Sequence, residues 1–136
     1  MTNVYGPRMV WAIRIAAAGV WFFFGFVLKV LGAEPRHEAI VAAVLGSAVA
    51  GPATVLVGLG EIVLGVWVLS GWRPRICAAA QTAAILAMNT LELIFAQELL
   101  LSPIGMVLAN TLFLSAVWYA ALRSPQPSAP VAASTS

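Results

Sequence analysis

One ionisable residue stands in the middle of a long apolar segment. Glu61 is the one charged residue between Pro52 and Gly71, a stretch long enough to cross a bilayer as a helix. A carboxylate at the bilayer centre costs about 2.5–3.5 kcal/mol, so its side chain should face protein or water rather than lipid. Gly58 and Gly65 lie on the same helical face and let another helix approach closely. The sequence therefore predicts that Glu61 points into a helix bundle.

Other polar residues fall at a similar level in neighbouring apolar segments. At about 1.5 Å per helical residue, Glu61, Asn89 and Asn110 should lie about 10–13 Å from the same end of the bundle. Glu92 follows Asn89 on the same helical face, and the Lys29 side chain is long enough to reach inward. These five residues are the predicted intramembrane polar layer.

Two interpretations of this layer stay open. Interhelical hydrogen bonds among Asn and Glu side chains could simply hold the bundle together. Alternatively, Glu61 is functional: protonated, it could donate to a carbonyl of a lipophilic ligand, and ionised, it would need Lys29 or Arg14 as its partner. With one cysteine and one histidine, the chain has no redox cysteine pair and no multi-histidine metal site of its own. We expect no catalytic residue, no metal and no intrinsic cofactor.

Aromatic residues cover a full turn of the first apolar segment, from Trp21 to Phe24. Packing against lipid is one explanation, and stacking with a quinone or a pigment is another. We select Trp21, Phe23 and Phe24 as candidate ligand or partner contacts. Because this small bundle has more large apolar groups than its own core can hold, we expect a homo-oligomer or docking onto larger membrane subunits.

The composition is that of an integral membrane protein. Hydrophobic residues make up 62% of the chain and charged residues only 9%, whereas a soluble domain carries about 25% charged residues. The net charge of +2 is too small to suggest nucleic-acid binding. Membrane lipid is therefore the first expected partner.

Four apolar segments are each long enough to span a bilayer, which predicts an all-α, antiparallel bundle of four transmembrane helices. They run over about 9–31, 52–71, 76–96 and 104–122. Between the first two, the apolar run from Ala39 to Val49 predicts a short interfacial or re-entrant helix that begins near Pro35 and ends at Gly51-Pro52. Residues 1–8 should form an N-terminal segment, 9–123 the membrane domain and 124–136 a disordered tail.

The positive charges predict the topology. Arg8, Arg73, Arg75 and Arg123 share one side of a four-span arrangement, and Arg36 lies on the other with acidic neighbours. By the positive-inside rule both termini should be cytoplasmic, and a bacterial inner membrane is the expected location.

Several short motifs follow one another along the chain in a defined order. The first motif is Trp21-Phe22-Phe23-Phe24-Gly25 with Lys29, and the second is Gly58-Leu59-Gly60-Glu61 with Gly65. Glu38, the Gly71-Trp72-Arg73 hairpin and Ser102-Pro103 with Asn110 complete the series. Over about residues 9–122, these motifs and their order resemble the DoxX-like family of small four-helix membrane proteins. The resemblance implies Lys29, Glu61 and Asn110 as functional positions. It also implies a link to membrane redox enzymes, because the family is named for its likeness to a membrane subunit of a thiosulfate:quinone oxidoreductase.

Three functions remain under consideration. The first is a non-catalytic accessory or structural subunit of a membrane complex, redox-linked and in contact with lipid or quinone. The second is a quinone-linked oxidoreductase subunit in which Glu61 relays protons. The third is a small transporter of a lipophilic or weak-acid solute, although the chain lacks the inverted repeat and broken helices typical of transporters.

Overall fold

The computed structural model describes residues 6–32 and 34–124, which form helices joined by short connections. In chain order the elements are α1 (Gly6–Phe22), the π-helix η1 (Phe23–Val30), α2 (Pro35–Leu45), α3 (Ser47–Ser70), α4 (Pro74–Phe95), the 3₁₀ turn η2 (Gln97–Leu99) and α5 (Pro103–Arg123). The described ranges contain no strand, and the predicted all-α fold is confirmed. The predicted tail beyond Ser124 lies outside the described residues.

Four helices are long and apolar enough to cross a membrane, as predicted. They are Gly6–Val30, in which η1 continues α1, Ser47–Ser70, Pro74–Phe95 and Pro103–Arg123. Most of their large apolar side chains point outward, such as Leu56 and Ile94, which are 68% and 66% exposed. An outward apolar surface of this extent is what a lipid environment stabilises and water does not.

The short helix between the first two spans ends earlier than predicted. The sequence suggested that Gly51-Pro52 would end it, but α2 ends at Leu45 and Gly51-Pro52 lies inside α3. Gly46 makes the break, because its φ of +95° is in a region that L side chains rarely adopt. Pro52 is tolerated within α3 near its beginning, where its missing N–H removes one hydrogen bond. Whether α2 is interfacial or re-entrant stays a prediction.

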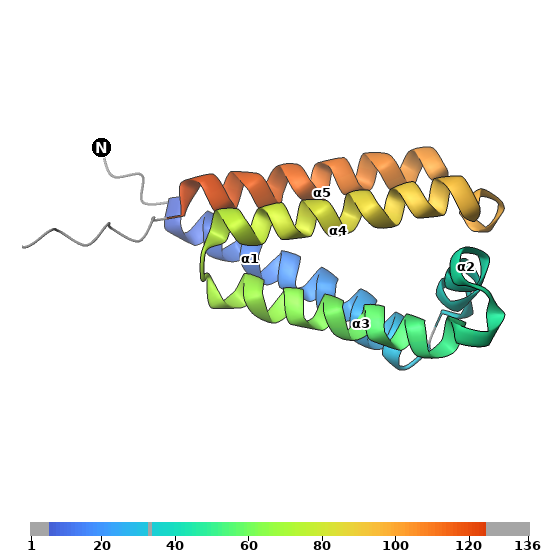
Figure 1. The fold of residues 1–136 in the computed structure, drawn as a ribbon. Coiled ribbons are helices and arrows are strands. Elements are labelled where there is room, and N and C mark those ends of the chain that lie inside the picture. Colours follow the sequence, from blue (N-terminus) through green and yellow to red (C-terminus); the bar gives the residue numbers. More distant parts are fainter. Residues whose placement is uncertain (1–5, 33, 125–136) are drawn as a thin grey trace, which may run out of the picture.

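The helices form two antiparallel pairs that meet at one end. Figure 1 shows α1 beside α3 and α4 beside α5, with α2 at the end of the bundle opposite the beginning of α1 and the end of α5. We call the end near α2 the α2 end, and the other the hairpin end, because the connection at Gly71 lies there. The buried apolar cluster joins α1, α3, α4 and α5 toward the hairpin end, through residues such as Ala18, Val68, Ala78 and Val117.

The first helix pair, in which α1 and η1 lie beside α3, is in close backbone contact. A Cβ atom added to Gly25 would lie 2.5 Å from the carbonyl oxygen of Gly58, and one added to Gly58 would lie 2.6 Å from that of Gly25. Gly65 packs against the ring of Phe22, 2.7 Å from an added Cβ. The glycines flanking Glu61 therefore admit α1 and η1 against α3, as their spacing predicted.

Candidate functional site

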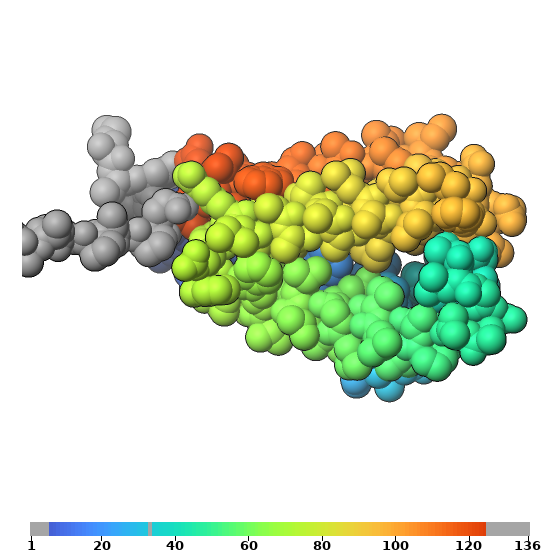
Figure 2. Space-filling view, in the orientation of Figure 1, coloured from blue at the N-terminus to red at the C-terminus, as the bar shows by residue number. Residues whose placement is uncertain are grey.

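A large cavity lies between the two helix pairs toward the α2 end. Its volume is about 580 Å³, within the range of pockets that hold small ligands. α1, η1, α2, α3, α4, α5 and the connection before α5 all contribute side chains to its wall. In Figure 2 a furrow runs between α3 and α4 beside α2, so the surface is hollowed on this face of the bundle. All five residues of the predicted polar layer line the cavity: Lys29, Glu61, Asn89, Glu92 and Asn110.

Lys29 and Glu61 form a buried ion pair at the cavity wall. The Lys29 Nζ lies 2.8 Å from Oε1 and 2.9 Å from Oε2 of Glu61. The two residues are 9% and 5% exposed, so the charges are largely removed from solvent. Two partners were considered for an ionised Glu61, and the structure pairs it with Lys29. The other candidate, Arg14, donates to the Ser124 hydroxyl at the hairpin end.

The π-helix is the element that turns Lys29 toward α3. Within η1, Gly25 and Lys29 are the buried positions, and both face the segment of α3 that carries Gly58 and Glu61. Stretches of π-helix are rare and are frequently found at functional sites. The wider turn also places the Lys29 ammonium 5.7 Å from the centroid of the Phe24 ring, where a cation–π attraction adds to the ion pair.

The opposite wall carries polar side chains from α4 and α5. Asn110 donates to Asn89 through an Nδ2–Oδ1 distance of 2.9 Å. An amide has two donor hydrogens and an acceptor oxygen, so this bond leaves each side chain with further capacity toward the cavity. Glu92 lines the same wall, one helical turn beyond Asn89. It forms no salt bridge, because the one salt bridge among residues 6–32 and 34–124 joins Lys29 to Glu61.

α2 contributes Arg36 and His37, which the sequence analysis did not place in the site. Nδ1 of His37 is buried and has no hydrogen-bond partner among the described residues, and the same holds for Nε of Arg36. Burial, together with the positive charges of Lys29 and Arg36, lowers the pKa of His37 to about 4 despite the opposing influence of Glu34. His37 is therefore neutral at pH 7. A buried polar atom without a partner inside a cavity is a signal that only the folded chain reveals.

Aromatic side chains form the apolar part of the cavity. Trp21 and Phe24, both selected from the sequence, line it with Phe113, whose ring packs edge-on against Trp21 at 6.0 Å. Phe23 is half exposed and does not line the cavity. Trp21 is held at the cavity wall by a buried hydrogen bond of 2.8 Å from its Nε1 to Oε1 of Gln81.

The comparisons with known proteins agree with this architecture. The family model described as the DoxX-like family matches residues 18–118, which include α3 and α4 in full, parts of the first and last long helices, and every residue that lines the cavity. This chain belongs to the DoxX-like family. It is an integral membrane protein. No curated protein and no solved structure matches the chain.

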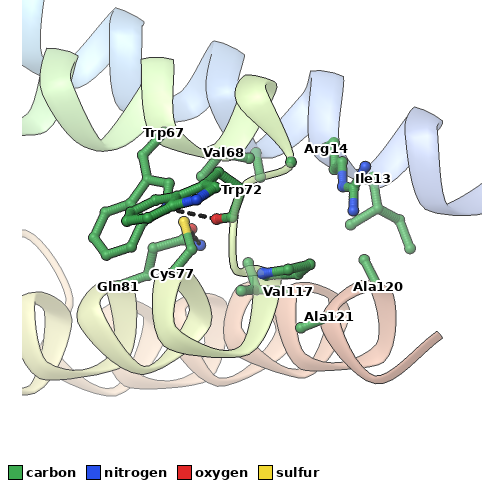
Figure 3. Close-up of a pocket in the computed structure, with 13 residues that line it drawn as sticks. Ile13, Arg14, Trp67, Val68, Trp72, Cys77, Gln81, Val117, Ala120 and Ala121 are labelled. Atoms are coloured by element: carbon green, nitrogen blue, oxygen red, sulfur yellow. Dashed lines mark hydrogen bonds between the residues drawn. The ribbon is translucent and has the colours of Figure 1, made fainter. Parts of the chain in front are cut away.

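A second cavity of this DoxX-like protein lies at the hairpin end and is about 30 Å³ in volume. Figure 3 shows Trp67, whose Nε1 donates to the carbonyl of Trp72 at 2.7 Å, with Cys77 and Gln81 below it and Arg14 to one side. This volume suits ordered water and no larger ligand. No group of three metal-ligating side chains occurs in the part of the chain that the structure describes.

The DoxX-like protein thus concentrates its polar groups at one end of one cavity. Lys29, Arg36, Glu92 and the asparagines lie toward the α2 end, and Trp21, Ile85 and Phe113 lie deeper in the bundle. Such a space can bind a molecule with a polar head and an apolar body. Its side chains supply hydrogen bonds, charge and aromatic surface.

Proposed function

We propose that this protein is a non-catalytic accessory subunit of a redox-linked membrane complex, and that its cavity holds a lipophilic ligand such as a quinone or a lipid. The observation that carries the proposal is the cavity of about 580 Å³, which combines aromatic walls with a buried ion pair and an amide pair. Pockets for small molecules typically have this combination of apolar lining and a few placed polar groups. The family's likeness to a quinone-linked enzyme subunit supports the redox setting.

The outer surface supports a role within a larger assembly. Phe23 and Phe26 of η1 are 50% and 48% exposed and lie on the same helix as the cavity residues Phe24 and Lys29. A larger membrane subunit that packs on this side would contact the wall of the site directly, and a second copy of the chain is the alternative occupant. In this proposal the termini are cytoplasmic in a bacterial inner membrane, as the positive-inside rule predicts.

A second candidate is supported by the position of Glu61. Its carboxylate reaches the cavity and is held by Lys29, so a quinone bound there would lie close to a group able to exchange a proton. In that case the chain would take part in quinone chemistry rather than only hold the ligand. A transporter is less well supported, because the four long helices of the described chain are not interrupted by unwound segments.

Purification from the native host in lipid nanodiscs tests the proposal. We expect a quinone or a defined lipid in the organic extract of the purified particle, together with subunits of a membrane redox enzyme identified by mass spectrometry. Bulk lipid alone, with no copurifying membrane protein, would contradict the accessory role. If Glu61→Gln keeps the partner and the ligand but abolishes turnover of the complex, the proton-relay alternative replaces it.

A further inference from the structure

Two opposite charges in the cavity remain apart. Arg36 on α2 and Glu92 on α4 both line the cavity, yet within the described residues the one salt bridge joins Lys29 to Glu61. Nε of Arg36 is buried and has no hydrogen-bond acceptor. A buried N–H donor without an acceptor is costly, and a ligand that supplies the acceptor removes that cost.

The other titratable groups near this end do not supply these partners. Lys29 and Glu61 neutralise each other at 2.8 Å, and His37 is neutral at pH 7. Glu34 caps the beginning of α2, where its carboxylate accepts from the backbone N–H of Arg36 at 3.1 Å rather than from the guanidinium. The cavity therefore offers one open cation and one open anion.

We propose that the cavity binds a zwitterionic membrane lipid, whose phosphate is bound by Arg36 and whose primary ammonium is bound by Glu92. An arginine matches phosphate oxygens through paired N–H donors, and a carboxylate accepts from an ammonium in a charge-assisted hydrogen bond. Two neighbouring side chains can add hydrogen bonds to the head group. Neutral His37 offers its unpartnered Nδ1 next to Arg36, and Asn89 offers its amide one turn from Glu92.

The shape of the cavity fits an amphiphile taken from the bilayer. The open charges lie toward the α2 end, and the apolar side chains of Trp21, Ile85 and Phe113 lie deeper. The furrow between α3 and α4 in Figure 2 gives acyl chains a sideways path to the surrounding lipid. This inference rests on the proposed function insofar as both need the same cavity, but it names the head group.

Native mass spectrometry of the full chain in detergent tests the head-group chemistry. The delipidated protein is titrated with phosphatidylethanolamine, phosphatidylglycerol and phosphatidylcholine of identical acyl chains. Phosphatidylethanolamine should bind about tenfold more tightly than phosphatidylglycerol, which has the phosphate but no ammonium. Phosphatidylcholine should bind more weakly than phosphatidylethanolamine, because its ammonium has no N–H donor. Equal binding of the three lipids would overturn the proposal.

Two charge variants assign the two ends of the head group. Arg36→Gln should weaken all three lipids, since all share the phosphate. Glu92→Gln should weaken phosphatidylethanolamine most and leave phosphatidylglycerol unchanged or tighter. Glu98→Gln and Arg73→Gln, whose residues do not line the cavity, are the matched controls and should keep the wild-type order. An unchanged preference in Glu92→Gln would refute the ammonium site.

The same titration separates this inference from the proposed function. A wild-type protein that retains a quinone but shows no phospholipid preference would refute the zwitterion site and leave the ligand-holding role intact. A folded protein that retains neither a quinone nor any lipid specifically would refute both.

Discussion

Lys29 and Glu61, which lie 32 residues apart in sequence, form a two-pronged ion pair, with Nζ 2.8 and 2.9 Å from the two carboxylate oxygens. The pair joins η1 to α3 at the wall of the cavity, where the same backbones are in contact through Gly25 and Gly58. Its burial makes each charge dependent on the other, because a lone charge at this position would have neither water nor a counter-charge.

Breaking the pair from one side should destabilise the protein more than removing both charges. Glu61→Gln or Lys29→Met alone should lower the unfolding free energy by about 3 kcal/mol, because each leaves one buried charge unpaired. The double variant Lys29→Met/Glu61→Gln should recover most of that loss. Denaturant titration in mixed micelles measures the coupling, and a double variant as unstable as the sum of the single ones would refute it.

The contact between glycines should tolerate no side chain. Gly58→Ala places a methyl group within 2.6 Å of the Gly25 carbonyl oxygen, so α3 must move away from η1 at a cost of about 1–3 kcal/mol. Gly60→Ala is the matched control on the same helix, because an added Cβ there meets nothing within 4 Å. Thermal unfolding should separate the two variants, and equal melting temperatures would show that the helices do not approach this closely.

The hydrogen bond between Trp21 and Gln81 should hold the aromatic wall. Gln81→Leu leaves the buried indole N–H without an acceptor and should cost about 1–3 kcal/mol. Thr82→Val, at the adjacent position, removes the acceptor of the Trp118 indole N–H. Because that hydrogen bond is only partly buried, Thr82→Val should lower the unfolding free energy by less than Gln81→Leu does. Denaturant midpoints compare the two, and a larger loss for Thr82→Val would contradict the burial of Trp21.

His37 should make the stability depend on pH. Its pKa is lowered to about 4 in the folded protein from an ordinary value of 6.5, so the unfolded chain binds the proton more readily. The stability contribution is fully present above pH 6.5 and falls as the pH drops toward 4. His37→Gln should flatten the profile in that window. The unfolding free energy of both proteins measured at pH 7.5, 6 and 4.5 checks this. An equal dependence on pH in His37→Gln and the wild type would show that another group is responsible.

The fold could be predicted from the sequence because it depends on local rules, and the five polar residues selected by the same rules line one cavity. Span length gives four helices, and the spacing of Gly58, Glu61 and Gly65 gives the packed face of α3. The partner of Glu61 could not be chosen between Lys29 and Arg14, because the π-helix that directs Lys29 inward has no simple sequence signal. Once Lys29 is known to be the partner, Glu61→Gln is expected to lower the stability of the protein.

The contribution of α2 could not be predicted for a different reason. The position of Arg36 and His37 depends on how α2 folds back over the bundle, which Gly32 and Gly46 permit through φ values of +68° and +95°. Hydropathy shows that this segment is too short to span, but it does not show which helices it covers. Its two unpartnered nitrogens become visible only when the cavity is formed.

A cavity-filling substitution is the most direct test of the central claim, that the space at the α2 end holds a lipophilic ligand. Ala109→Phe puts a ring into the cavity, whereas Ala87→Phe adds the same ring to an exposed position outside the cavity lining. The measurement is the amount of quinone and lipid that each purified, folded variant retains after delipidation, determined by extraction and mass spectrometry. The account predicts that Ala109→Phe loses the retained molecule while Ala87→Phe keeps it at the wild-type level. Equal retention in all three proteins would contradict it.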